Sequence, residues 1–212
     1  MKGDATMDVG KARSEFCLEF NLKAERRKTE LKEPAQHQKD ALRKLQKWYE
    51  TGEQPSGALL VLPTGGGKTF TAQRFMCGGP ISDGYKVLWL AHTHHLLEQS
   101  LTSLNDSVHR VAEPREKLIA RVVSGTIGHF KPRDIKPTDD VLIATLQTAY
   151  SAHERKHPGW ETFLQSAEGR LFVLFDEAHH SPAYTYRKLI QALREKCEDM
   201  HSWYDSHAHV HG

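Results

Sequence analysis

Short apolar runs alternate along the chain with segments in which apolar residues recur at helical spacing. The runs occupy residues 59–62, 87–91, 118–123, 141–144 and 171–175. Runs of this length, without strict polar alternation, are typical of strands that are buried on both faces of a sheet. The pattern therefore predicts an α/β fold in which five parallel strands alternate with helices that cover both faces.

The segments between the runs predict the helices. Apolar residues recur three or four positions apart within residues 41–51, 70–76, 93–104, 160–166 and 184–196, and another helix is expected from Gln147. Residues 126–140 contain two prolines and predict a long loop. We expect residues 34–200 to form one domain.

The two ends of the chain lack this pattern. Residues 1–33 are rich in lysine, arginine and glutamate, which predicts a solvated N-terminal extension. The apolar alternation from Phe16 to Leu22 allows one short strand in that extension. Residues 201–212 carry four histidines and show neither a helix nor a strand pattern, so we expect a disordered tail.

A glycine-rich turn follows the first apolar run and leads into a helix. Its residues are Pro63, Thr64, Gly65, Gly66, Gly67, Lys68 and Thr69. Strand, glycine turn and helix in this order are the context of a phosphate-binding loop, because glycines let backbone N–H groups approach phosphate oxygens and a helix N-terminus attracts anions. Lys68 would contact the β- and γ-phosphates of a nucleotide, and the Thr69 hydroxyl would bind Mg²⁺. The strict pattern begins with glycine, but Leu62 stands at that position.

An acidic pair, Asp176 and Glu177, follows the most apolar run. Ligands of parallel sheets bind at the carboxyl ends of the strands, where both this pair and the glycine turn are expected. Asp176 would hold Mg²⁺ through water, and Glu177 would polarise the water that attacks the γ-phosphate. Without the glycine turn, a helix cap would be the simpler interpretation of the pair. His179 and His180 lack the spacing of a zinc motif.

Composition restricts the remaining possibilities. The 212 residues include 29 basic and 27 acidic side chains, so any nucleic-acid affinity has to come from local patches. Cys17, Cys77 and Cys197 are widely spaced and form no CxxC, which argues against a disulfide framework or a zinc site. No segment has the apolar length of a membrane span or of a signal-peptide core, and we expect a cytoplasmic protein.

Five motifs together resemble those of the superfamily 2 helicases, in particular the helicase portion of the type III restriction Res subunit and related DEAH-type DNA translocases. The matching stretches are residues 37–41 (Q motif), 62–69 (motif I), 89–99 (motif Ia), 144–148 (motif Ib) and 176–179 (motif II). Motifs I and II are specific as a pair, and the other three are weaker. The resemblance implies a RecA-like domain that binds ATP and Mg²⁺ and has DNA as a partner.

The resemblance also implies roles for polar residues outside the phosphate loop. Gln38 would read the adenine edge, and His179 would link the ATP state to the nucleic-acid strand. The residues expected near the nucleic-acid backbone are His92, Thr93, Thr145 and Gln147. A threonine hydroxyl at a helix start suits a phosphate and equally caps the helix, so both interpretations stay open for Thr93 and Thr145.

The resemblance further implies a sixth strand that ends in Gly-x-Thr-Ala-Thr-Pro, and then a second RecA-like domain with an arginine finger. The sequence after Met200 contains neither. A reading frame displaced by one nucleotide across residues 203–209 permits Gly-Met-Thr-Ala-Thr-Pro, so we hypothesise a frameshift near Met200 and expect a sheet without its last strand. A metal-binding tail of His207, His209 and His211 is the alternative interpretation.

The sequence thus predicts the ATP-binding motor domain of a superfamily 2 DNA helicase or translocase. As a fragment it would bind MgATP and hydrolyse it slowly, because catalysis in this class uses an arginine that a second domain supplies. That domain is expected to come from another polypeptide if the fragment is active. Two alternatives remain: a P-loop ATPase without a nucleic-acid role, and an inactive nucleotide- or DNA-binding remnant.

Overall fold

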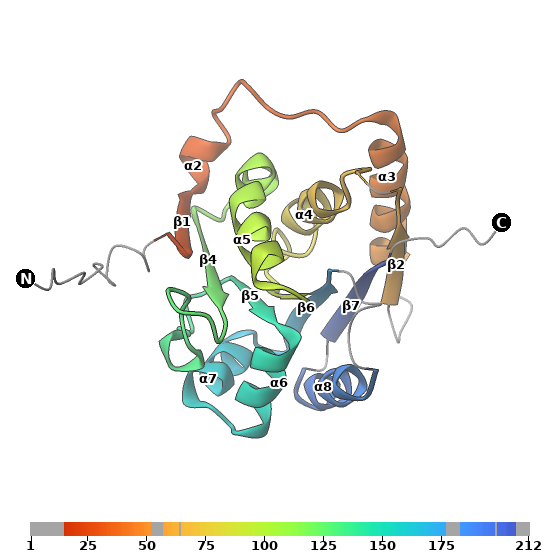
Figure 1. The fold of residues 1–212 in the computed structure, drawn as a ribbon. Helices are drawn as coiled ribbons and strands as arrows, with labels where there is room; N and C mark the ends of the chain where they lie inside the picture. The colour runs from red at the N-terminus through yellow and green to blue at the C-terminus, as the bar shows by residue number, and fades with distance from the viewer. Residues whose placement is uncertain (1–14, 52–56, 64, 177–182, 198, 207–212) are drawn as a thin grey trace, which may run out of the picture.

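A computed structural model describes residues 15–51, 57–63, 65–176, 183–197 and 199–206 (Figure 1). The first half contains, in order, β1 (Cys17–Asn21), α2 (Leu22–Glu25), α3 (Gln36–Thr51), β2 (Gly57–Val61), α4 (Lys68–Gly78), β3 (Lys86–Ala91) and α5 (His94–Ser103). The second half contains η1 (Leu104–Asp106), η2 (Val108–Arg110), β4 (Lys117–Val123), η3 (Pro132–Asp134), β5 (Val141–Thr145), α6 (Leu146–Glu154), α7 (Pro158–Ser166), β6 (Arg170–Phe175), α8 (Ala183–Lys196) and β7 (Asp199–Ser206). All five predicted strands and all six predicted helices are present.

The strands form one sheet in the order β1-β4-β5-β3-β6-β7-β2. Six strands are parallel, and β1 pairs antiparallel with β4 at one edge. The predicted α/β fold with a mainly parallel sheet is therefore confirmed. Because the parallel strands share one direction, the residues that follow β2, β3, β5 and β6 all emerge at the same edge of the sheet.

Helices cover both faces of the sheet (Figure 1). Helices α3, α4 and α5 lie on one face, where Phe75 and Leu97 join a core with Trp89 of β3. Helices α6, α7 and α8 lie on the other face, where Phe163 packs in a second core with Leu88. Neighbouring residues of β3 thus serve opposite cores, which explains why the apolar runs show no polar alternation.

The expectation of a missing last strand and of a disordered tail from residue 201 is wrong for residues 201–206. These residues belong to β7, which pairs with β6 on one side and β2 on the other. His201 is buried, and its ring lies 5.3 Å from Tyr49 and 5.6 Å from Tyr85 between ring centroids. A strand between two others gains backbone hydrogen bonds on both sides, so it needs no apolar alternation to form. Residues 207–212 lie outside the described part.

The expected domain start at residue 34 is also too late. The apolar alternation in the extension forms β1, and Asn21 caps α2 by accepting a hydrogen bond from the N–H of Ala24 at 3.1 Å. Phe20 and Leu22 are buried in the core on the α4 side. The sheet therefore begins at Cys17. In the residues described here, no helix combines the length and apolarity that crossing a bilayer requires.

Candidate functional site

The turn between β2 and α4 adopts a backbone conformation that favours glycine. The φ angles of Gly65 and Gly67 are 74° and 76°, in the left-handed region that residues with a Cβ rarely occupy. The N–H of Gly66 donates to the carbonyl oxygen of Pro63 at 2.8 Å, which closes the turn. The backbone angles and this hydrogen bond therefore confirm the glycine turn that the sequence predicts.

The space around the three glycines differs. A Cβ at Gly65 would meet no atom within 4 Å, whereas one at Gly66 would come within 2.8 Å of the carbonyl oxygen of Pro63. A Cβ at Gly67 would overlap with Nε2 of Gln38. The backbone thus excludes a side chain at Gly66, a side chain at Gly67 would have to displace Gln38, and the turn is open beside Gly65.

Helix α4 begins at Lys68, directly after the turn, and its N-cap residue is Gly67, which has no side chain that could cap it. The first N–H groups of a helix have no partner within the helix, and the helix dipole favours an anion at this end. Nζ of Lys68 lies 3.5 Å from the carbonyl oxygen of Leu62, so the side chain folds back over the turn. Thr69 lies beside it in the first helical turn. N–H groups at a helix start, a positive helix end and an ammonium group together can hold a phosphate.

The start of α3 packs against this turn. Nε2 of Gln38 donates to the carbonyl oxygen of Gly66 at 2.9 Å, and Nε2 of His37 lies 3.0 Å from the same oxygen. Oε1 of Gln38 accepts from the N–H of Ala35 at 2.9 Å. Both ends of the Gln38 amide are therefore engaged with the protein, and its predicted contact with adenine remains a prediction. His37 was not among the predicted site residues, although it is the first residue of the Q motif.

Asp176 follows β6 directly and is buried, with 5% of its surface exposed. Its backbone N–H donates to the carbonyl oxygen of Leu90 in β3 at 2.8 Å. Between β6 and β2 lies only β7, and the register pairs Phe175 with Tyr204 and Val61 with Ser206. Because neighbouring strands are roughly 5 Å apart, Asp176 lies roughly 10 Å across the sheet from Leu60, which precedes the glycine turn by three residues. The fold thus brings motifs I and II to one edge.

Several predicted residues lie outside the described part of the chain: Thr64, Glu177, His179 and His180. Within the described ranges, no three His, Cys, Asp or Glu side chains gather as a protein metal cage would require.

The residues predicted near nucleic acid lie at the starts of α5 and α6, at the same edge of the sheet. Oγ1 of Thr93 accepts a hydrogen bond at 3.4 Å from the backbone N–H three residues later. Oγ1 of Thr145 accepts from the N–H of Thr148 at 3.2 Å and donates to its hydroxyl at 2.8 Å. Both threonines therefore cap helices. Thr145 is buried and fully engaged, whereas Thr93, His92 and Gln147 are exposed.

A loop that follows β4 is braced by a lysine. It overlaps the loop predicted over residues 126–140, but the bracing contacts were not predicted. We call residues 124–131 the β4 loop. Nζ of Lys131 donates to three carbonyl oxygens of this loop, those of Ser124 at 3.2 Å, Gly125 at 2.9 Å and Thr126 at 2.8 Å. Ile127 is 97% exposed. The loop begins where β4 ends, next to the end of β5, so it presents an apolar side chain at the same edge as the motifs.

The mainly parallel sheet with helices on both faces matches a RecA-like helicase domain. Residues 31–198 match the family described as the type III restriction enzyme Res subunit, and the chain belongs to that family. No curated protein sequence matches the chain.

Solved structures of similar fold include two helicases and a restriction-modification enzyme. The DUF1998 helicase MrfA superimposes with a TM-score of 0.61 at 19% identity, over 88% of this chain and 29% of that chain. The UvsW helicase from bacteriophage T4 gives 0.51 at 18% identity, over 96% of this chain and 61% of that one. The Type ISP restriction-modification enzyme LlaGI gives 0.53 at 18% identity, over 82% of this chain and 17% of that one. The chain thus spans less than a third of MrfA, and at these identities the likeness shows the fold alone.

Proposed function

We propose that this domain binds MgATP in the turn between β2 and α4, and that ATP hydrolysis there drives movement along DNA when a second motor domain is present. The observation that carries the proposal is the glycine turn itself, with two left-handed glycines, the second of which is the N-cap of the helix behind it. The family match supports the motor role. MrfA has been solved with DNA and with DNA and AMPPNP, which supports the choice of ligands.

The residues of the site fit MgATP. Backbone N–H groups at the start of α4 and the ammonium of Lys68 would bind the phosphates. Mg²⁺ is usually held by one or two protein oxygens together with phosphate oxygens and water, so Thr69 as a ligand and Asp176 acting through a bound water would suffice. The bound nucleotide supplies the phosphoryl group that is transferred to water. Glu177, directly after Asp176, would take the proton of that water.

DNA would bind along the edge at which β3, β4 and β5 end. The exposed residues there are His92, Thr93 and Gln147, and the β4 loop lies beside them. Polar side chains and helix N-termini are the usual partners of phosphate oxygens. Thr145 would act by holding the start of α6 and not by touching DNA, because its hydroxyl is buried and engaged with Thr148.

An arginine of a second motor domain would complete the catalytic site. In this class of reaction such an arginine raises the turnover rate by about 10³ to 10⁵. We therefore expect the 212-residue chain to bind nucleotide and to turn it over slowly.

The test is a titration of MgATP into the wild-type chain, Lys68→Ala and Glu177→Gln, followed by turnover with and without single-stranded DNA. The proposal is supported if only Lys68→Ala loses MgATP binding and if turnover is slow. Turnover that ignores DNA favours a P-loop ATPase without a nucleic-acid role. Salt-sensitive DNA binding without nucleotide affinity favours an inactive remnant. Brisk, DNA-stimulated turnover by the chain alone contradicts the need for a second domain.

A further inference from the structure

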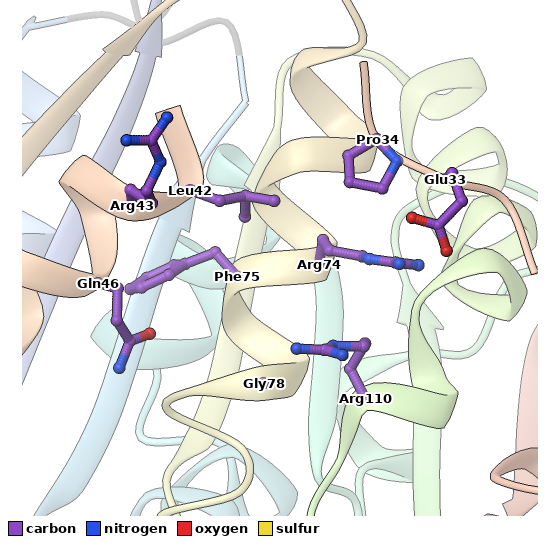
Figure 2. Close-up of a pocket in the computed structure, with 9 residues that line it drawn as sticks. All are labelled: Glu33, Pro34, Leu42, Arg43, Gln46, Arg74, Phe75, Gly78 and Arg110. Carbon is purple, nitrogen blue, oxygen red and sulfur yellow. The ribbon is translucent and has the colours of Figure 1, made fainter. Parts of the chain in front are cut away.

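A cavity of about 370 Å³ opens between α3, the second half of α4 and η2 (Figure 2). Its apolar wall is formed by Pro34, Leu42 and Phe75, and two guanidinium groups, those of Arg74 and Arg110, line it from α4 and η2. The cavity lies away from the glycine turn. Arg74 is six residues after Lys68 on the same helix, which places it roughly 9 Å further along the axis.

Arg74 is held in place by neutral partners. Its Nη1 donates to the carbonyl oxygen of Asp106 at 3.3 Å and lies 3.3 Å from Nε2 of His109. The side chain is 92% buried, since only 8% of its surface is exposed. Its guanidinium also lies over the ring of Phe70, 5.5 Å from the centroid. A guanidinium has five N–H donors, so this fixed group has donors to spare.

Arg110 brings a second positive charge to the same cavity. Figure 2 shows its side chain reaching beneath α4 toward Gly78. In the part of the chain that the structure describes, neither Arg74 nor Arg110 forms an ion pair with a carboxylate. Burial lowers the pKa of Arg74, and the positive charge of Arg110 lowers it further. The carboxylate of Glu33, at the rim, opposes this shift. Burial also lowers the pKa of His109, and the charges of Arg74 and Arg110 lower it further.

The other polar side chains of the cavity are already paired. Arg43 forms an ion pair with Asp40, and Nε2 of Gln46 donates to Oε1 of Glu50 at 2.9 Å. Apart from these paired groups, the cavity therefore carries the two positive charges of Arg74 and Arg110 and the single negative charge of Glu33. Figure 2 shows the two side chains extending in opposite directions, Arg74 toward Glu33 and Arg110 toward Gly78. Their charges still act on each other, and an anion bound in the cavity would offset this repulsion.

We propose that this cavity binds the phosphate group of a free, small phosphate ester, with Arg110 on the phosphate, Arg74 adding its positive charge from α4, and the apolar part of the ligand against Leu42 and Phe75. Phosphate matches the fork of N–H donors that guanidinium groups present. The apolar wall and the limited volume favour a small ligand over a nucleic-acid strand, which needs an open groove. The site is separate from the one proposed for MgATP.

The probe for the test is phenyl phosphate, titrated into the full chain by calorimetry in the presence of saturating MgATP, which occupies the glycine turn. Arg110→Gln is the main variant, because Arg110 is exposed and its replacement leaves the core intact. We expect its affinity for phenyl phosphate to fall about ten- to hundredfold, since a charge-assisted pair of hydrogen bonds is lost. Its affinity for MgATP should be unchanged.

Arg43→Gln is the matched control, because this arginine lines the same cavity but already pairs with Asp40. We expect it to bind phenyl phosphate as the wild type does. Lys68→Ala, measured without MgATP, should also keep phenyl phosphate binding and lose MgATP. Unchanged binding in Arg110→Gln overturns the proposal, as does loss of phenyl phosphate binding in Lys68→Ala. If Arg110→Gln weakens binding of single-stranded DNA but not of phenyl phosphate, the cavity is a nucleic-acid contact and the proposal is wrong.

Discussion

Oγ of Ser124 lies 2.7 Å from Nδ1 of His129. The other nitrogen of the ring, Nε2, lies 2.9 Å from Oε1 of Glu98 on α5. With a neutral imidazole, Nε2–H donates to Glu98, the hydroxyl of Ser124 donates to Nδ1, and Ser124 accepts from the N–H of Thr126 at 3.1 Å. Serine, histidine and carboxylate in a row resemble a hydrolytic triad, but Ser124 and His129 are buried. The chain of hydrogen bonds therefore holds the β4 loop to α5.

We predict that His129→Ala loosens the β4 loop without unfolding the domain. The substitution removes both hydrogen bonds of the ring, so the N–H of Thr126 should exchange with solvent at least about tenfold faster, the effect of losing roughly 1 to 2 kcal/mol of local stability. Hydrogen exchange measures this directly. His94→Ala is the control, because the His94 ring contacts the ring of His129 but is exposed. Equal exchange rates in both variants would show that the hydrogen bonds of His129 are not what holds the loop.

The glycine turn permits a second prediction, on stability. Gly65→Ala and Gly67→Ala both place a Cβ at a positive φ, which costs roughly 1 to 2 kcal/mol. Gly67→Ala should cost roughly 1 kcal/mol more, because its Cβ displaces Gln38 from the carbonyl oxygen of Gly66. Denaturant unfolding measures both. In a Gln38→Ala background the excess should vanish, and an excess that persists there would mean that Gln38 is not its cause.

The bidentate pair of Arg121 and Asp139 is the basis of a third prediction. Nε and Nη2 of Arg121 lie 2.7 and 3.0 Å from the two carboxylate oxygens, and the side chains are 5% and 0% exposed. Hydrogen bonding to Asp139 raises the pKa of Arg121 against the opposing effect of burial. Asp139→Ala leaves a buried charge unpaired and should lower the free energy of unfolding by about 3 to 5 kcal/mol.

An exposed pair serves as the control for that prediction. Lys117 and Glu19 also lie on paired strands, with side chains 53% and 61% exposed. Glu19→Ala should change the free energy of unfolding by about 0 to 1 kcal/mol. Similar losses in Asp139→Ala and Glu19→Ala would refute the role assigned to burial.

A fourth prediction concerns alkaline pH. Burial raises the pKa of the Cys77 thiol to about 12 in the folded chain, with Arg74 opposing the shift, while the unfolded value is 9.0. The folded state therefore keeps this proton where the unfolded state loses it. Its stabilising effect is complete below pH 9 and is lost as the pH rises from about 9 to 12, by up to about 1.4 kcal/mol per pH unit.

Chemical unfolding of the wild type and Cys77→Ala at pH 8 and pH 10 tests this prediction. The wild type should lose more stability between the two values than the variant does. The same shift predicts that Cys77 reacts with thiol reagents at pH 8 only after unfolding, because the thiolate is the reactive form. A fast reaction in the native state would contradict the burial of this thiol.

A fifth prediction comes from the outer edge of β2. In the described residues β2 has a strand partner only on the β7 side, and Leu59 and Val61 are 60% and 45% exposed. A free edge with apolar side chains promotes association between copies of a chain. We expect Leu59→Lys to shift the chain toward the monomer in light scattering at high concentration. Leu60→Lys, on the buried face of the same strand, should instead unfold the domain. Unchanged association in Leu59→Lys would exclude this surface as the contact.

Local signals were sufficient for most of the fold and for the conformation of the glycine turn. The apolar runs predict β2 to β6, and Gly65 to Thr69 predict the phosphate loop, because backbone freedom and burial on both sides are properties of short segments. Phe16 to Leu22 carry the alternation of β1. Their membership of the sheet depends on β4, about a hundred residues later, so it could not be inferred from the segment alone.

The remaining features depend on contacts between distant segments. β7 has no apolar pattern and forms because β6 and β2 both offer a backbone edge, a property of the sheet order. The sequence left two roles for the hydroxyl of Thr145, a contact with phosphate and a helix cap. In the structure this hydroxyl is buried at the start of α6, where it caps the helix. The brace of Glu98 and His129 and the cavity of Arg74 and Arg110 join side chains from different elements. Side-chain spacing along the chain carries no signal for such contacts, because packing in three dimensions alone brings these groups together.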